Sequence, residues 1–107
     1  MNDYQQKTPV FPPEITYLAN FNEVGGNSLG GKIIITPEFL VFRPHSVNFG
    51  DLSDRVFEIR NITGYRKGFL TFFYISFAGG WEISLSVWKK QEIMDALESR
   101  RRVLLGI

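Results

Sequence analysis

The sequence predicts a mainly β domain with six or seven short antiparallel strands and one C-terminal helix. Its 107 residues include 44% hydrophobic and 15% aromatic residues, a composition typical of a folded domain rich in strands. Short apolar and β-branched runs recur between turn residues as far as position 87, and the apolar residues after it follow the spacing of a helix. A chain of this length is expected to build one core.

The N-terminal segment is predicted to lie outside that core. Residues 1–13 are mostly polar and end in prolines, which lack an amide donor and bias their neighbours towards extended conformations. We expect a flexible tail over residues 1–13, which contacts the domain only through Val10 and Phe11. A single domain is expected over residues 14–107.

Three strands are predicted in the first half of the domain. Residues 15–24 form the first strand, which ends in a glycine-rich loop. Residues 32–36 and 39–43 form a hairpin, because Pro37 presets the φ angle of the turn between them. Pro44 cannot donate to a strand ladder, so the hairpin is expected to end there.

A long loop follows, up to residue 54. Turn-forming residues dominate it, and a loop of this length is usually stabilised by a few apolar contacts. Three apolar residues are therefore expected to hold it against the domain: Val47, Phe49 and Leu52.

The second half contains the strongest strand signals. Residues 56–62 and 63–67 predict one or two strands, and residues 69–77 and 81–87 predict a hairpin. A three-residue turn with Gly80 in the left-handed region gives this hairpin one wholly apolar face. The predicted pairs on that face are Phe77 with Trp81, Ile75 with Ile83, and Phe73 with Leu85.

The C-terminal helix is predicted from apolar residues at helical spacing. Basic residues in its last turn complement the helix dipole, Gly106 follows its end, and Glu98 is expected to pair with Arg102. The predicted core of the domain comprises Ile33, Ile35, Leu40, Phe42, Phe57, Ile59, Ile83, Leu85, Ile93 and Leu97.

Residues 30–45, GGKIIITPEFLVFRPH, resemble a bacterial GRAM domain of the pleckstrin-homology-like superfold. The shared pattern is a Gly-Lys pair before a short apolar strand, a Thr turn, and a second strand with a Val-Phe core. The resemblance extends through residues 49–51 and 57–59 to the helix. It implies a partly open, seven-stranded antiparallel barrel of two nearly perpendicular sheets, capped by the C-terminal helix.

Some pleckstrin-homology-like domains bind inositol phospholipids through basic residues around the loop between their first two strands. Here residues 22–31 contain Glu23 and no Lys or Arg, which leaves Lys32 alone beside this loop. One cation is too little for a multiply charged headgroup, so we expect no phosphoinositide site there.

Two short motifs that suggest chemistry are better explained as a hairpin loop. Residues 26–32 satisfy Gly-x-x-x-x-Gly-Lys, but Ile33 stands where Mg²⁺ coordination needs Ser or Thr, and a strand is predicted where a P-loop needs a helix. Residues 26–30 also fit Gly-x-Ser-x-Gly, which requires a strand-to-helix turn in a larger sheet.

The titratable residues do not predict an enzyme. His45 is the only histidine, and the chain has no cysteine for a thiol nucleophile or a zinc site. Asp51 and Asp54 lack the spacing of a calcium loop and are expected to be turn formers, like Glu58. We expect no catalytic residue, no metal, no cofactor and no small-molecule substrate.

The favoured function is a non-enzymatic recognition or adaptor domain for protein association, including self-association. The predicted hairpin register places three residues on an outer face that the helix cannot cover, a candidate partner surface of Leu70, Phe72 and Tyr74. The alternative is a peripheral membrane module that binds anionic lipid weakly through local basic residues. The candidate basic surface comprises Arg66, Lys67, Lys89, Lys90, Arg100, Arg101 and Arg102.

Other partners are not expected. The net charge of +1 gives no overall field that would attract nucleic acid, and Phe69 and Trp88 are expected to belong to the core and not to stack on bases. The opening residues lack the apolar segment of a secretory signal, so a cytoplasmic location is expected.

Overall fold

The computed structural model describes residues 14–48 and 50–107. The predicted tail over residues 1–13, with Val10 and Phe11, lies outside the described residues, as does Phe49. In chain order the elements are β1 (Ile15–Asn22), β2 (Ser28–Ile35), β3 (Phe39–Pro44), β4 (Arg55–Glu58), the short 3₁₀ helix η2 (Ile59–Asn61), β5 (Ile62–Lys67), β6 (Phe72–Phe77), β7 (Trp81–Ser86) and α1 (Lys90–Leu105).

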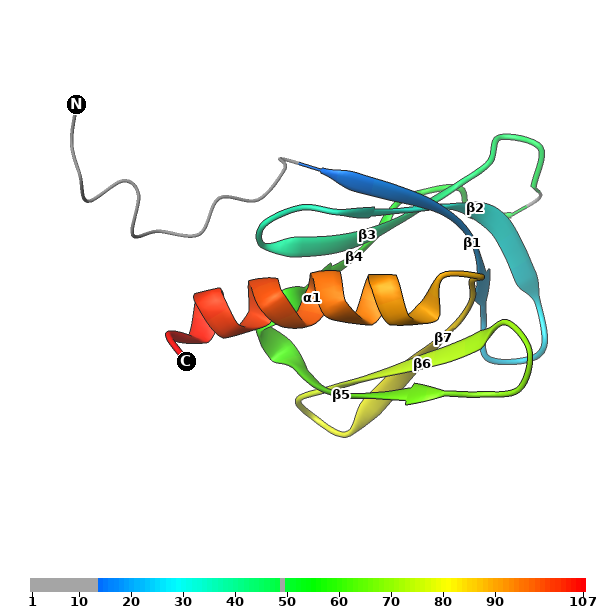
Figure 1. The fold of residues 1–107 in the computed structure, drawn as a ribbon. Coiled ribbons are helices and arrows are strands. Elements are labelled where there is room, and N and C mark those ends of the chain that lie inside the picture. The colour runs from blue at the N-terminus through cyan, green and yellow to red at the C-terminus, as the bar shows by residue number, and fades with distance from the viewer. Residues whose placement is uncertain (1–13, 49) are drawn as a thin grey trace, which may run out of the picture.

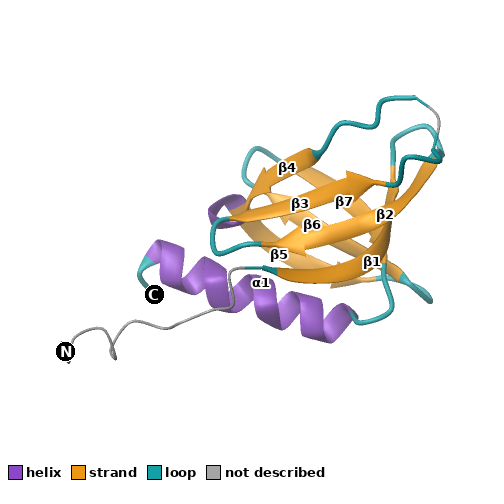
Figure 2. Cartoon of the chain, turned by 90° about the horizontal axis from the view of Figure 1, so that it is seen from above, coloured by secondary structure: helices purple, strands orange, loops and turns teal. Residues whose placement is uncertain are grey.

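All seven described strands form one antiparallel sheet, in the order β4-β3-β2-β1-β7-β6-β5. β1 pairs with β2 along its full length, but with β7 only over Asn20–Asn22, which face Ser84–Ser86. The sheet curls around this junction and stays open between its edge strands β4 and β5 (Figure 2). The mainly β, partly open architecture predicted from the sequence is confirmed, whereas the two implied sheets are one continuous sheet.

α1 lies across one side of the curled sheet, between the β1–β4 half and the β5–β7 half (Figure 1). It packs against η2 and β5 and buries Ile93, Leu97 and Arg100. Gly106 ends the helix in the left-handed conformation, with φ of 71°, and its amide donates to the last turn. The helix therefore covers one side of the curled sheet, whereas the resemblance implied a cap over one end of the barrel.

Nine of the ten residues predicted for the core are buried, and Phe57 is partly buried against it. The predicted register of the β6–β7 hairpin is also confirmed, with Phe77 opposite Trp81, Ile75 opposite Ile83 and Phe73 opposite Leu85. Phe73, Ile75, Phe77, Ile83 and Leu85 point into the core, which explains why only this register satisfies the apolar face.

β2 starts four residues earlier than predicted and includes the glycine pair of the resemblance. Position 31 requires glycine because its backbone passes close to β3. A Cβ atom at this position would lie 2.2 Å from the carbonyl oxygen of Arg43. Since a strand and not a helix contains these glycines, residues 26–32 lack the context of a P-loop.

Other boundaries differ from the prediction as well. β1 ends two residues early, η2 interrupts the predicted strand 56–62, and residues 69–71 form a turn instead of the start of β6. Among the described residues of the loop before β4, Val47 and Leu52 are exposed, so the prediction that they hold the loop against the domain was wrong. Polar groups hold it instead, because the Asn48 amide donates to the carbonyl oxygen of Gly30 at 2.7 Å.

Candidate functional site

Four large apolar side chains are strongly exposed at one end of the molecule, around the start of α1. Their exposed fractions are 77% for Leu18, 78% for Phe69, 70% for Leu70 and 86% for Trp88. Isolated surface apolar residues are common, but a cluster of them on a small domain is typical of an interaction surface. We call these four residues the apolar end.

Leu18 and Trp88 come together where β1 passes the start of α1. Leu18 lies on the outer face of β1, because the residues on either side of it, Tyr17 and Ala19, point inward. Trp88 lies in the short link between β7 and α1. Both side chains line a shallow hollow of about 350 Å³, together with Tyr17, Lys89 and Ile93.

Phe69 and Leu70 form the turn between β5 and β6. The Gly68 amide donates to the Phe72 carbonyl at 2.9 Å, and the Phe72 amide donates to the Phe69 carbonyl at 3.0 Å, so the turn is tight. The Val87 amide donates to the Thr71 carbonyl at 2.8 Å, which places this turn directly beside the link that contains Trp88.

Leu70 adopts a φ angle of 53°, the only positive value for a non-glycine residue in the described part of the chain. A branched side chain in the left-handed region costs about 1–2 kcal/mol, and most of the Leu70 side chain faces solvent, where little packing offsets that cost. The turn therefore presents Leu70 outward at the expense of stability.

Four lysines surround the apolar end. Lys32 is the β2 partner of Leu18, and Lys89 follows Trp88 directly. The Lys90 ammonium donates to the Gly68 carbonyl at 2.8 Å, and the Lys67 ammonium donates to the side chain of Gln91. These two hydrogen bonds fix cations at the base of the turn.

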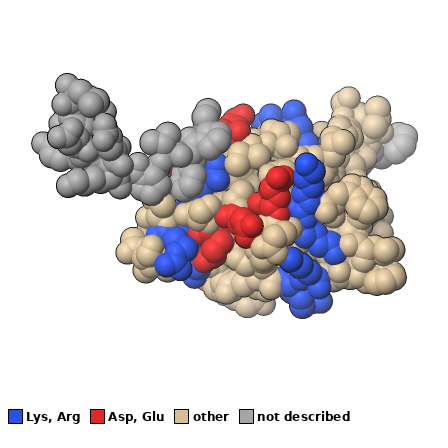
Figure 3. Space-filling view, viewed as in Figure 1, with Lys and Arg blue, Asp and Glu red and all other residues tan. Residues whose placement is uncertain are grey.

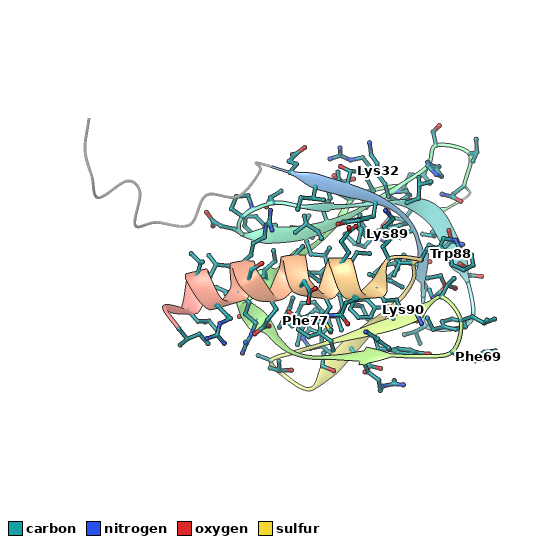
Figure 4. The ribbon with its side chains drawn as sticks, viewed as in Figure 1. Lys32, Phe69, Phe77, Trp88, Lys89 and Lys90 are labelled. Atoms are coloured by element: carbon teal, nitrogen blue, oxygen red, sulfur yellow. The ribbon has the colours of Figure 1, made fainter. Side chains whose placement is uncertain are left out.

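The figures show this arrangement directly. Phe69, Trp88, Lys32, Lys89 and Lys90 all lie towards the end of the molecule where α1 begins, whereas Phe77 lies inside the fold behind the helix (Figure 4). In the space-filling view, basic side chains form a column between the acidic residues over α1 and the uncharged surface at that end (Figure 3).

The acidic residue in the first turn of α1 is Glu92. It interacts with the Tyr17 hydroxyl, whose pKa is raised by partial burial and by this hydrogen bond and charge. The acidic charge is thus directed towards β1, beside the lysines.

The sequence predicted only part of this site. Phe72 and Tyr74 lie on the outer face of β6 as expected, opposite Ser86 and Ser84, whereas Leu70 lies in the turn before this strand. Leu70 is the most exposed of the three, Phe72 is 39% exposed and stacks on Tyr74, and the Arg66 guanidinium covers the Tyr74 ring at 3.9 Å from its centroid. Phe69 and Trp88, predicted to be core residues, are instead exposed, and the prediction was wrong for both.

The predicted basic surface does not form one patch. Arg100 is 1% exposed, because it lies on the same helix face as Ile93 and Leu97, so its assignment to the surface was wrong. Burial also lowers the pKa of Arg100. Lys67, Lys89 and Lys90 join the apolar end, whereas Arg102 is exposed in the last turn of α1.

Arg101 and Arg66 have structural roles. The Arg101 Nε donates to the Ile62 carbonyl at 2.7 Å, and its Nη1 lies 3.2 Å from Glu98, so Glu98 pairs with Arg101 and not with Arg102 as predicted. Arg66 pairs with Glu82 at 3.2 Å. These contacts connect elements of the fold.

A second hollow of about 320 Å³ lies between the edge strand β5 and α1. The Tyr65 hydroxyl donates to Glu98 across it at 3.1 Å. Burial raises the pKa of Tyr65, and the hydrogen bond and charge of Glu98 raise it further. Tyr65, Glu98 and Arg101 thus tie the helix to the strand along this hollow.

The loop between β1 and β2 borders a third hollow of about 520 Å³. Arg55 lines this hollow. Its guanidinium group lies 3.0 Å from the Glu23 carboxylate and also donates to the carbonyls of Asp51 and Ser53. The cation at this loop is therefore neutralised within the fold.

The acidic loop residues have hydrogen-bond partners in the fold. Asp51 accepts from the amide and hydroxyl of Ser53, and Asp54 accepts from Arg43, which lowers the pKa of Asp54. Across residues 14–48 and 50–107, no group of three acidic or histidine side chains is placed to hold a metal ion. In the same residues, no helix has the length and apolarity to span a bilayer.

Comparison with known proteins identifies the architecture. No family model matches the chain, and no curated protein matches its sequence. The C-terminal domain of an unknown protein from Leishmania infantum is similar in structure, with a TM-score of 0.67 and 16% sequence identity over 92% of this chain and 89% of that one. This similarity shows the fold alone.

Proposed function

We propose that this protein is a non-enzymatic recognition domain, related to GRAM domains, that attaches to a larger partner surface through its apolar end. The observation that carries the proposal is the exposure of Leu18, Phe69, Leu70 and Trp88 at one end of the molecule, where Leu18 and Trp88 line one hollow and the Phe69–Leu70 turn is hydrogen-bonded to the neighbouring link. Burying large apolar side chains yields about 1.5–3 kcal/mol each, so a partner that covers all four gains a substantial driving force.

The backbone at Leu70 supports the same proposal. Leu70 adopts the left-handed conformation at a conformational cost although it packs on little of its own domain. Strain of this kind is common at binding sites, where the geometry of the side chain serves a partner. The turn that contributes Phe69 and Leu70 to the apolar end is thus both exposed and hydrogen-bonded in one conformation.

The experiment compares the size and sedimentation of the protein in a lysate of its own cells. Wild-type protein is expected in a sedimenting or high-mass fraction, and the variant Leu18→Ser with Trp88→Ser is expected in the fraction of free monomer. The control variant is Val24→Ser with Val47→Ser, which removes two equally exposed apolar residues outside the apolar end. Circular dichroism verifies that each variant is folded.

An unchanged distribution of the Leu18→Ser, Trp88→Ser variant would contradict the proposal. An equal shift of the control variant would also contradict it, because the effect would then reflect surface hydrophobicity in general. The experiment does not depend on the chemical nature of the partner.

A further inference from the structure

We infer that the partner surface is an anionic lipid bilayer, into which Phe69, Leu70 and Trp88 insert while the surrounding lysines contact the headgroups. The inference rests on the proposed attachment through the apolar end. It concerns a site at the β5–β6 turn and the start of α1, and no part of the loop between β1 and β2.

The type of cation favours a bilayer over a protein. All four basic residues at the apolar end are lysines: Lys32, Lys67, Lys89 and Lys90. Lysine is depleted in protein–protein interfaces, where arginine and aromatic residues are enriched. Lysines next to exposed apolar side chains are typical of proteins that lie on anionic membranes, because the ammonium groups stay hydrated among the headgroups.

The apolar residues also have the distribution expected for insertion. Phe69 and Leu70 form the tip of a tight turn, and Trp88 occupies the neighbouring link, so the three side chains can enter a lipid layer without any change in the fold. Tryptophan is enriched at the boundary between headgroups and hydrocarbon, because its ring is apolar and its N–H is polar. The carbonyl groups of Gly68, Phe69 and Thr71 already accept hydrogen bonds, which reduces the cost of bringing the turn into contact with lipid.

The hydrogen bonds of the lysines fix their distance from the turn. Lys90 is bonded to the carbonyl of Gly68, and Lys67 is bonded to Gln91, so both ammonium groups lie at the base of the Phe69–Leu70 turn. Lys32 lies opposite Leu18 on the neighbouring strand and Lys89 directly follows Trp88, so both can reach towards phosphates from beside these apolar side chains. The charges at the base of the turn would then lie at the depth of the headgroups, and the apolar side chains at its tip would lie in the hydrocarbon.

The charge of the site predicts how binding depends on lysine. Each lysine near an anionic bilayer contributes about fivefold to the partition coefficient, which corresponds to about 1 kcal/mol. The variant Lys32→Gln with Lys89→Gln should therefore bind about 25-fold more weakly. The matched control is Arg60→Gln with Arg102→Gln, which removes two exposed charges in η2 and in the last turn of α1 and should change binding less than about twofold.

The experiment is sedimentation of the purified protein with vesicles. One set contains phosphatidylcholine with about one-third phosphatidylglycerol, and the other contains phosphatidylcholine alone. Wild-type protein should sediment with the anionic vesicles at about 0.1 M salt and be released at about 0.5 M salt, where screening is strong. Phe69→Ser with Leu70→Gly should reduce binding at least about tenfold without lowering the melting temperature.

Trp88 provides a readout of insertion. In a Trp81→Phe variant it is the single tryptophan, since the chain has two. Its fluorescence should shift to shorter wavelength with anionic vesicles and be quenched by brominated lipid chains. An unchanged spectrum with bound protein would overturn the insertion of this residue.

The remaining outcomes separate this inference from the proposed function. Equal binding to neutral and anionic vesicles would overturn the role of the lysines. Absence of vesicle binding, together with a lysate distribution that still depends on Leu18 and Trp88, would overturn the bilayer and leave a protein as the partner. A stable dimer of the purified protein that Trp88→Ser abolishes would identify a second copy of this chain as the occupant, and would also overturn the bilayer.

Discussion

Replacing Leu70 with glycine should give a more stable domain than replacing it with alanine, which reverses the usual order of these two residues. Leu70 has a φ angle of 53° and a side chain that is mostly exposed. Both substitutions remove the same side chain atoms beyond Cβ. Their difference therefore isolates the conformation of the backbone.

The size of the effect follows from two opposing contributions. Removing Cβ from a left-handed residue gains about 1–2 kcal/mol. The greater freedom of glycine in the unfolded chain costs about 0.4–1 kcal/mol. At the midpoints of these ranges the difference is about 0.8 kcal/mol in favour of glycine, which for a domain of this size raises the melting temperature by about 3–6 °C.

Thermal unfolding of the two variants, followed by circular dichroism, measures this difference. A melting temperature of Leu70→Ala equal to or above that of Leu70→Gly would refute the left-handed conformation of Leu70. The strain that supports the proposed site would then be absent. In vesicle sedimentation both variants should bind more weakly than wild type, because both lack the leucine side chain, whereas only their stabilities should differ.

Three further predictions concern the fold and its pH dependence. Leu97→Ala should lower the free energy of unfolding by about 2–5 kcal/mol in urea titration, because this side chain is fully buried under α1, and a change below about 1 kcal/mol would contradict its place in the core. Arg101→Met should lower the free energy of unfolding by about 1.5–3 kcal/mol through loss of the charged hydrogen bond to the Ile62 carbonyl. Arg102→Met changes the exposed neighbour and should lower it by less than about 0.5 kcal/mol. Equal losses in the two variants would contradict the structural role of Arg101. The pKa of Tyr65 is raised in the folded protein, so its stabilising contribution is complete below the unfolded pKa of about 10 and is lost as pH rises above that value. Tyr65→Phe should therefore reduce the alkaline loss of unfolding free energy measured by urea titration. An unchanged dependence of the unfolding free energy on pH would show that folding does not raise the pKa of this hydroxyl.

The regular elements were predictable from the sequence because their two faces differ. Ile83 and Leu85 alternate with serines, and only one register with β6 keeps both in the core, so the pairing followed from the sequence alone. The same reasoning would have identified Arg100, which shares a helix face with Ile93 and Leu97, and Leu18, which occupies an outward position of its strand.

Residues at the ends of elements were the ones that the sequence could not place. Phe69 lies in a turn and Trp88 in a link, where neither the period of a strand nor that of a helix determines the direction of a side chain. Their proximity depends on the hydrogen bond between Val87 and Thr71, which is a tertiary contact. The apolar end therefore became visible only in three dimensions.

The junction between β1 and β7 has a consequence for the order in which the protein assembles. The strands before η2 and those after it are two meanders of neighbouring hairpins, and each can form from contacts close in sequence. They are joined through Asn22, whose side-chain amide donates to Ser84 and Ser86, residues 62 and 64 positions away. During synthesis, the edge of β1 that pairs with β7 stays unpaired until β7 has left the ribosome. We therefore expect the closing of this junction, and not the formation of either meander, to set the rate at which the barrel becomes complete.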